Sequence, residues 1–191
     1  MIGRAYARLF HRQTRRGDPC GRPHQEVLNT EHSKRKVMRL QKYNYAEDVP
    51  YFITVCTDNR KCILSELAEP VPGSIQLHLT ELGNVAETTL LELAENYGFL
   101  IYTYVIMPNH VHILISPGKS GMTVGRYIGA WKSLVANRWV KICTAEGKIM
   151  GKLWQRDFYD HIIRNEADFA EKWEYIRANP YKWHEDTLYI K

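Results

Sequence analysis

Apolar residues recur along this chain with two periods, one typical of strands and one typical of helices. Short runs rich in Val, Ile, Tyr and Phe, bounded by Pro, Asn, Asp or Gly, predict strands. These runs cover residues 50–57, 100–107 and 110–116. Only Pro108 and Asn109 separate the last two runs, so we expect these strands to form an antiparallel hairpin. Residues 147–154 are expected to form a short strand or a connector.

Other segments place apolar residues at helical spacing. They cover residues 81–97, residues 123–141 and a stretch that runs from Glu166 to the residue before Pro180. Thr80 and Asn165 are candidate N-caps, and Gly98 is suited to end the first helix. The order strand-helix-strand-strand-helix, with further elements after it, predicts a compact α+β fold in which helices pack on one face of an antiparallel sheet. We find no internal repeat and no second domain.

Two histidines stand one residue apart at the start of an apolar run, Met107-Pro108-Asn109-His110-Val111-His112-Ile113-Leu114-Ile115. Successive side chains on a strand point to opposite faces, so His110 and His112 share one face. Neutral imidazole is a common metal ligand, and two imidazoles leave coordination positions open for a third protein group and a substrate oxygen. The alternative is an ordinary polar face of a strand.

Tyr175 and Asn179 are spaced i and i+4 on the last predicted helix, so they lie on the same side of it. Phe169, Trp173 and Ile176 make the apolar stripe of this helix, about a third of a turn away. A phenol and a carboxamide therefore face the same place. The alternative is a tyrosine that covers the edge of the core and an asparagine that ends the helix.

These two motifs together resemble the HUH single-tyrosine transposases, in which a His-hydrophobic-His strand and a Tyr-Ile-x-x-Gln or Tyr-Ile-x-x-Asn helix build one DNA-cleaving site. Further stretches are similar to the REP-associated tyrosine transposases within that superfamily. They are Tyr51–Thr57 with Asn59 and Arg60, Lys132 with Ser133, and Leu153–Arg164 before the Tyr175 helix. The resemblance covers residues 38–182, and the order and spacing of its motifs are specific.

The resemblance implies a ferredoxin-like sheet with the histidines on a central strand. It also implies a metal-dependent endonuclease and transposase that cleaves and rejoins single-stranded DNA at REP-like hairpins. Tyr175 would be the nucleophile that forms a 5′-phosphotyrosine bond, and His110, His112 and the Asn179 oxygen would be the metal ligands. Imidazole ligands favour Mn²⁺ or Zn²⁺, whereas the family points to Mg²⁺ or Mn²⁺, so we expect Mg²⁺ or Mn²⁺.

The implied partner is a DNA hairpin with a short flanking tetranucleotide. The REP-associated group is expected to act as a monomer, although in relatives with swapped helices the tyrosine comes from a partner subunit. Basic side chains suited to DNA phosphates are Lys132, Arg138, Arg156, Arg164 and Lys182. An ordinary solvated surface is the alternative reading of these residues.

Charge is concentrated at the start of the chain. Residues 1–42 carry a net charge of +8, against +5 for the whole chain, so the remainder is acidic by about three charges. Residues 1–37 are expected to be a basic, disordered leader, and residues 38–191 the transposase domain. The leader either contacts nucleic acid, or is a solvated extension, or is translated from a REP-like DNA hairpin that lies beside the gene. In the last case Met38 is the natural start.

Composition narrows the class further. No apolar stretch approaches the length of a membrane span, so we expect a cytoplasmic, nucleoid-associated protein. The four cysteines lack paired metal spacing and are expected to be thiols. His161 is either a residue that orients the metal site or, more simply, a structural histidine. Tyr159 is a reserve candidate for the nucleophile.

Other classes of function remain compatible with these motifs. A metal-dependent phosphodiesterase would use bound water in place of the tyrosine. A hairpin-binding protein without catalysis would need neither metal nor nucleophile. A replication-initiating HUH nuclease would share the chemistry, but it usually carries additional domains.

Overall fold

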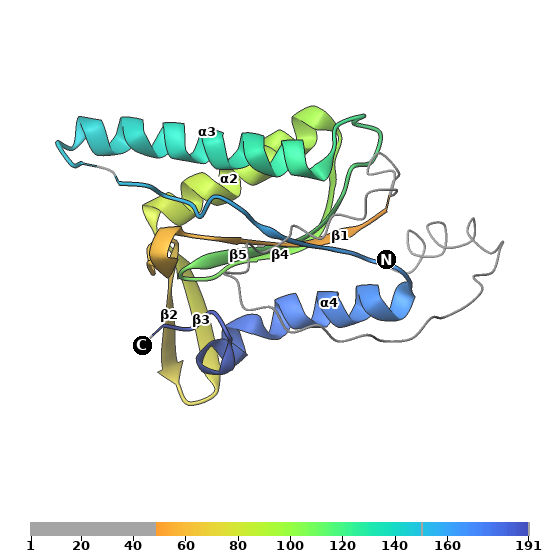
Figure 1. Cartoon of the computed structure of the whole chain (residues 1–191). Helices are drawn as coiled ribbons and strands as arrows, with labels where there is room; N and C mark the ends of the chain where they lie inside the picture. The colour runs from red at the N-terminus through yellow and green to blue at the C-terminus, as the bar shows by residue number, and fades with distance from the viewer. Residues whose placement is uncertain (1–48, 150, 191) are drawn as a thin grey trace, which may run out of the picture. The chain divides into compact units, whose positions relative to one another are not determined.

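The structure is a computed structural model that describes residues 49–149 and 151–190 (Figure 1). The predicted leader and the alternative start at Met38 lie outside the described residues. The strands are β1 Tyr51–Cys56, β2 Ser65–Val71, β3 Ser74–Leu79, β4 Leu100–Ile106, β5 His110–Ser116 and β6 Tyr159–Ile162. The helices are α2 Glu81–Tyr97, α3 Val124–Ala145 and α4 Glu166–Ala178, with short 3₁₀ segments η1 Asp58–Arg60 and η2 Asn179–Glu185.

The main sheet has the strand order β4-β5-β1-β6, and every neighbouring pair in it is antiparallel. Apart from the β2–β3 insertion, the elements follow the order β-α-β-β-α-β, which with this strand order is ferredoxin-like. The histidine-bearing strand β5 is central, between β4 and β1, as predicted. The expectations of an α+β antiparallel sheet and of the hairpin between β4 and β5 are confirmed.

Helices α2 and α3 cover one face of this sheet (Figure 1). That face carries Ile53, Val55, Val111 and Ile113, which join one buried core with residues of α2 and α3. Trp131 of α3 is fully buried there. Its indole N–H donates to the Ala86 carbonyl of α2 over 2.9 Å, while Tyr127 donates to the Leu90 carbonyl over 2.6 Å. These bonds satisfy polar atoms that the apolar layer would otherwise leave unpaired.

The ends of the helices follow the local signals in the sequence. Thr80, Thr123 and Asn165 each accept a hydrogen bond from a backbone N–H in the first turn of their helix. Gly98 ends α2 in the left-handed conformation with φ 71°. The predicted helix boundaries are confirmed for α2, while α3 extends to Ala145, beyond the expected residue 141.

Helix α4 packs on the face opposite α2 and α3 (Figure 1). The prediction placed helices on one face, and the structure adds this single helix to the other. Phe169 and Ile176 are its buried residues, and the Phe169 ring meets Tyr102 of β4 edge-on at 5.1 Å. The polar face of β5 therefore lies under α4, which brings the two sequence motifs together.

The strands β2 and β3 form a separate two-stranded ribbon that contacts η2. We predicted no element for these residues. Within the described residues, no helix is long and apolar enough to cross a membrane.

Gly83 marks where the ribbon joins α2. A Cβ at Gly83 would overlap the carbonyl oxygen of Leu64, which itself accepts a bond from the Thr80 N–H over 3.0 Å. Gly83→Ala is therefore expected to lower the free energy of unfolding by about 1–3 kcal/mol. Urea unfolding checks this value. Gly129→Ala, in open space within α3, is the control and should gain up to about 1 kcal/mol from helix propensity; equal effects of the two changes would contradict the steric account.

Candidate active site and metal centre

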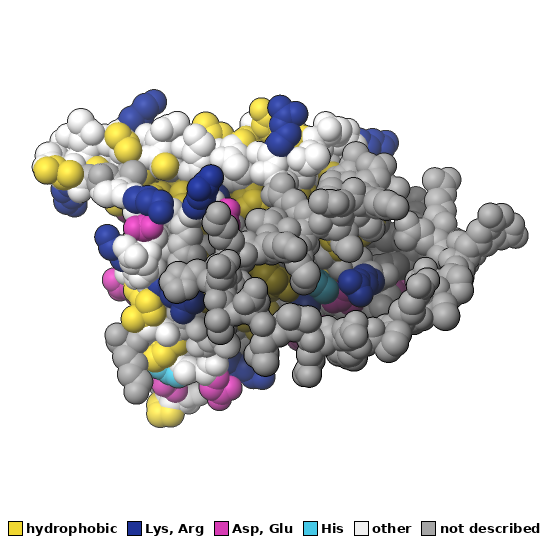
Figure 2. Space-filling model, viewed as in Figure 1, with side chains coloured by type: hydrophobic (Ala, Val, Ile, Leu, Met, Phe, Trp, Pro, Cys, Tyr) yellow, Lys and Arg dark blue, Asp and Glu magenta, His cyan; other side chains and the backbone are white. Residues whose placement is uncertain are grey.

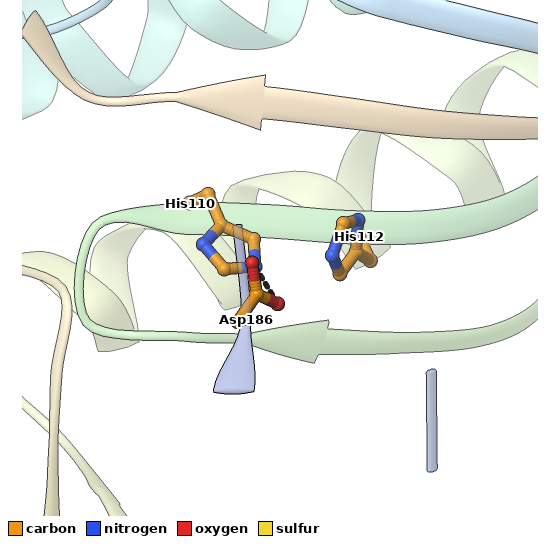
Figure 3. A group of neighbouring side chains, drawn as sticks. All are labelled: His110, His112 and Asp186. Carbon is orange, nitrogen blue, oxygen red and sulfur yellow. Dashed lines mark ion pairs between the residues drawn. The ribbon is translucent and has the colours of Figure 1, made fainter. Parts of the chain in front are cut away.

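His110 and His112 project from β5 to the same side, where the carboxylate of Asp186 meets them (Figure 3). One ligand atom from each of the three residues lies within 4.8 Å of the others. The Nε2 atom of His110 is 3.9 Å from Oδ2 of Asp186. Both imidazoles are buried, with 0% and 2% of their surface exposed.

The hydrogen bonds of His110 settle which of its nitrogens carries the proton. Nδ1 of His110 lies 2.8 Å from Oδ1 of Asn109, and an amide oxygen can only accept. Asn109 is held in this orientation because its Nδ2 donates to the Leu188 carbonyl over 2.8 Å. His110 Nδ1 is therefore the donor, and in the neutral ring Nε2 carries a lone pair toward Asp186.

His112 is oriented by a similar contact. Its Nδ1 lies 2.8 Å from the Thr54 hydroxyl, which is able to accept a proton from it. Within the described residues, the Nε2 atoms of both histidines are buried without a hydrogen-bond partner. Buried polar atoms are normally paired. Two buried imidazole nitrogens that have no hydrogen-bond partner and lie close to a carboxylate are therefore suited to bind a divalent metal ion.

Burial keeps both imidazoles in the metal-binding form. It lowers the pKa of His110 to about 4, outweighing the Asp186 carboxylate and Asn179, which raise it. Burial also holds the pKa of His112 well below its usual value, and the neighbouring His110 adds to the shift. At neutral pH both rings are therefore uncharged, and the contact between His110 and Asp186 is not an ion pair in that state.

Tyr175 reaches the same group from α4, and Asn179 reaches it from the start of η2. The Nδ2 atom of Asn179 donates to Oδ2 of Asp186 over 2.7 Å, and the Tyr175 hydroxyl lies 3.5 Å from that oxygen. The Tyr175 ring meets His112 edge-on at 5.2 Å. The shared direction that the i, i+4 spacing predicted is thus observed. Oδ1 of Asn179 is buried without a hydrogen-bond partner among the described residues, as a further metal ligand would be.

Tyr175 is half-exposed, with 43% of its surface accessible. Partial burial raises the pKa of its phenol, and the charge and hydrogen bond of Asp186 raise it further. Tyr175 is therefore protonated at neutral pH, so a group near it must take its proton or stabilise the phenolate before it acts as a nucleophile.

Asp186 was missed by sequence reasoning. It follows η2, which continues the chain beyond α4 and returns it to the histidines. Its Oδ1 accepts from the Leu188 N–H over 2.7 Å, so the carboxylate is fixed from both sides. Asp186 stands beyond Pro180, where the predicted helix ends, so the helical spacing that relates Tyr175 to Asn179 could not be extended to it.

His161 lies elsewhere. Its Nε2 is 2.9 Å from both carboxylate oxygens of Asp168 in the first turn of α4. Burial alone would raise the pKa of Asp168, but the bonds from the Arg164 N–H and from His161 outweigh it and lower that pKa. This contact ties β6 to the start of α4, which agrees with the structural reading of His161.

The predicted DNA-binding residues divide into two groups. Lys132 donates to the carbonyls of Gln155 and Arg156, and Arg138 pairs with Glu92 and the Thr89 hydroxyl. The side chains of Arg156, Arg164 and Lys182 are exposed.

On the face shown in Figure 2, Lys and Arg side chains are scattered among apolar and neutral ones rather than gathered in one patch. A role for all five residues in DNA binding stays a prediction.

Two histidines on the central strand of an antiparallel sheet, with a tyrosine-bearing helix across them and an aspartate beside them, form a group that could hold a metal ion. The model of the family described as IS200-like transposase matches residues 45–179. The chain belongs to this family and so stands among the transposases.

Individual relatives agree with this assignment. An uncharacterised protein of Haemophilus influenzae is 29% identical over 178 residues, which cover 82% of this chain and 93% of that protein. A second protein of the same organism, whose provisional name is REP-associated tyrosine transposase, is 28% identical over 110 residues. That match covers 55% of this chain and 62% of the relative.

A solved structure of a REP-associated tyrosine transposase bound to a REP hairpin has the same fold. Its TM-score is 0.54 at 21% identity, and the match covers 76% of this chain and 74% of that one. The predicted resemblance to the REP-associated tyrosine transposases is confirmed by these two matches.

Thr54 gives a direct test of the metal centre. Thr54→Val keeps the shape of the side chain but removes the partner of His112 Nδ1, so the imidazole loses its fixed orientation. We expect Mn²⁺ binding to weaken by about 10- to 100-fold, as for other residues that orient metal ligands. Titration followed by electron paramagnetic resonance of free Mn²⁺ measures the change. Thr54→Ser keeps the hydroxyl and should bind nearly as the unchanged protein does; equal losses in both variants would contradict this role.

Proposed function

We propose that this protein is a metal-dependent endonuclease and transposase that cleaves and rejoins single-stranded DNA at REP-like hairpins. The observation that carries the proposal is the convergence of Tyr175, Asn179 and the two histidines on the carboxylate of Asp186. A tyrosine hydroxyl beside a group fit for a metal is what nucleophilic attack on a phosphodiester requires. Family membership and the relatives named for REP association support the choice of substrate.

In the proposed reaction the Tyr175 oxygen attacks the phosphorus of one phosphodiester. The Tyr175 hydroxyl gives up its proton to solvent as its oxygen bonds to phosphorus, the bond from phosphorus to the 3′ oxygen breaks, and this oxygen takes up one proton and leaves as a 3′-hydroxyl, so that no net proton is gained or lost. The 5′ phosphate stays on Tyr175. Because the new bond is a phosphodiester, a later 3′-hydroxyl can attack it and rejoin the strand.

His110, His112 and Asp186 would hold a divalent ion, with the Asn179 oxygen as a further ligand. Mg²⁺ or Mn²⁺ bound there would polarise the phosphate oxygen and offset the charge that develops on it. The protein itself keeps the imidazoles neutral and fixes Tyr175 beside them. The Phe52 ring stacks on His112 at 5.1 Å and meets Tyr175 edge-on at 5.8 Å, so it packs against both residues.

The proposed active form is a monomer. One chain supplies both the histidines and the tyrosine, with the rings of His112 and Tyr175 in contact. This arrangement supports a site that needs no helix from a second subunit.

The test uses a hairpin oligonucleotide with single-stranded flanks, taken from the DNA beside the gene and labelled at either end. With Mn²⁺, the 3′ label should migrate with the protein on a denaturing gel, while the 5′ label appears on a shorter free strand. EDTA should prevent both products. Mass spectrometry should place the adduct on the peptide that contains Tyr175. Cleavage that leaves a free 5′ phosphate would instead indicate a metal-dependent phosphodiesterase, and binding without cleavage would indicate a hairpin-binding protein.

A further inference from the structure

Tyr159 is an exposed aromatic residue on the same sheet face as the candidate site. In the register of the sheet it pairs with Thr54 of β1, and Thr54 pairs with His112 of β5. Residues directly opposite one another in antiparallel strands point to the same face. Tyr159, Thr54 and His112 therefore form one row across three neighbouring strands, and two strand spacings separate Tyr159 from His112, about 10 Å.

The ring of Tyr159 extends the aromatic surface that begins at the site. It meets Phe52 edge-on at 6.4 Å, and Phe52 in turn contacts both His112 and Tyr175. Phe52 is 5% exposed, whereas Tyr159 is 59% exposed. Strand β6 is the edge of the main sheet, so Tyr159 stands where this aromatic row reaches solvent.

A single exposed tyrosine on an edge strand needs no functional explanation by itself. What distinguishes Tyr159 is its place in the row of aromatic rings that leads through Phe52 to the candidate nucleophile Tyr175. A strand whose phosphate lies at Tyr175 must place neighbouring nucleotides on one side or the other of the site, and unpaired bases stack on exposed aromatic rings whatever their sequence. Tyr159 provides such a ring, with one aromatic residue, Phe52, between it and Tyr175.

We propose that the Tyr159 ring stacks on a base of the single strand next to the phosphate that Tyr175 attacks. This inference rests on the proposed function and adds a base-binding residue to it. It also gives Tyr159 a role other than that of reserve nucleophile, since it is the Tyr175 hydroxyl that lies 3.5 Å from Asp186 of the candidate metal group.

The experiment measures binding of the full chain to the fluorescein-labelled hairpin in EDTA, so that cleavage is not needed. A single abasic nucleotide is moved step by step along the single-stranded flank. At one position the abasic change should weaken binding to the unchanged protein by about 5- to 150-fold. Tyr159→Ala should cause a similar loss on the intact hairpin and no further loss when that same nucleotide is abasic.

Two variants separate stacking from other effects. Tyr159→Phe keeps the ring and should bind as the unchanged protein does. Tyr97→Ala is the matched control, because Tyr97 is 44% exposed at the end of α2, on the other side of the sheet, and its loss should not change binding. If Tyr159→Ala binds the hairpin normally, or loses affinity equally at every abasic position, the stacking proposal is wrong.

The adduct assay is run in parallel and reports on the proposed function alone. If no adduct forms but Tyr159→Ala loses no further affinity at that one abasic position, which is the coupling between Tyr159 and that base, the stacking inference stands as a DNA-binding property. An adduct without the coupling would leave the nuclease proposal intact and overturn the role of Tyr159.

Discussion

Tyr175→Phe is expected to abolish the covalent adduct and to reduce hairpin cleavage by at least about 10³-fold. The change removes only the hydroxyl that would attack phosphorus. The ring contacts with Phe52 and His112 remain available to phenylalanine, and the lost contact with Asp186 is long, at 3.5 Å. The fold and the affinity for the hairpin should therefore be kept.

Single-turnover cleavage with labelled DNA, together with a binding titration in EDTA, measures both quantities. Tyr159→Phe and Tyr181→Phe are matched controls, because both tyrosines are exposed and each change removes one hydroxyl. Both controls should cleave at the normal rate. If Tyr175→Phe still cleaves, water bound to the metal and not Tyr175 attacks the phosphorus. If Tyr159→Phe alone loses cleavage, Tyr159 is the nucleophile.

Most of the fold was predictable because its signals are local. Thr80 and Asn165 cap their helices through side-chain bonds to residues three positions away, which a sequence pattern records directly. The alternation of β5 likewise fixes the shared face of His110 and His112. These predictions needed no knowledge of how distant segments meet.

The missed elements differ in the strength of their local patterns. Strand β2 is largely exposed and Pro70 interrupts it, so it shows no clear apolar face. Strand β3 does alternate, with Ile75, Leu77 and Leu79 half-buried on one face, and this local signal was overlooked. Strand β6 is only four residues long. It is held by pairing with β1, a contact across more than a hundred residues of chain.

The site shows the same division between local and distant information. The i, i+4 spacing brought Tyr175 and Asn179 together, but only the path of η2 brings Asp186 to them. Basic residues posed a different difficulty. Charge alone does not reveal that Arg138 pairs with Glu92 or that Lys132 donates to backbone carbonyls, and a role for these side chains in DNA binding stays a prediction.

Removing either histidine is expected to abolish specific binding of a divalent ion. Each of His110 and His112 offers an Nε2 atom without another partner among the described residues, and loss of one leaves too few donors for a stable site. In the unchanged protein, Mn²⁺ at 100 times its dissociation constant should add about 2.7 kcal/mol to the free energy of unfolding. For a domain of this size that corresponds to a rise in Tm of about 5–10 °C. His110→Ala and His112→Ala should show no such rise.

Calorimetry with and without Mn²⁺ measures the rise, and His161→Ala is the control because its contact is with Asp168. Comparing Asp186→Ala with Asn179→Ala then identifies the third ligand. A carboxylate oxygen of Asp186 lies within 4.8 Å of a nitrogen of each imidazole, and carboxylates are preferred ligands of hard cations. The loss of Asp186 should therefore reduce the rise in Tm caused by Mn²⁺ more than the loss of Asn179 does. A larger effect of Asn179→Ala would make the asparagine oxygen the principal third ligand, and an unchanged rise in His110→Ala would place the metal elsewhere in the protein.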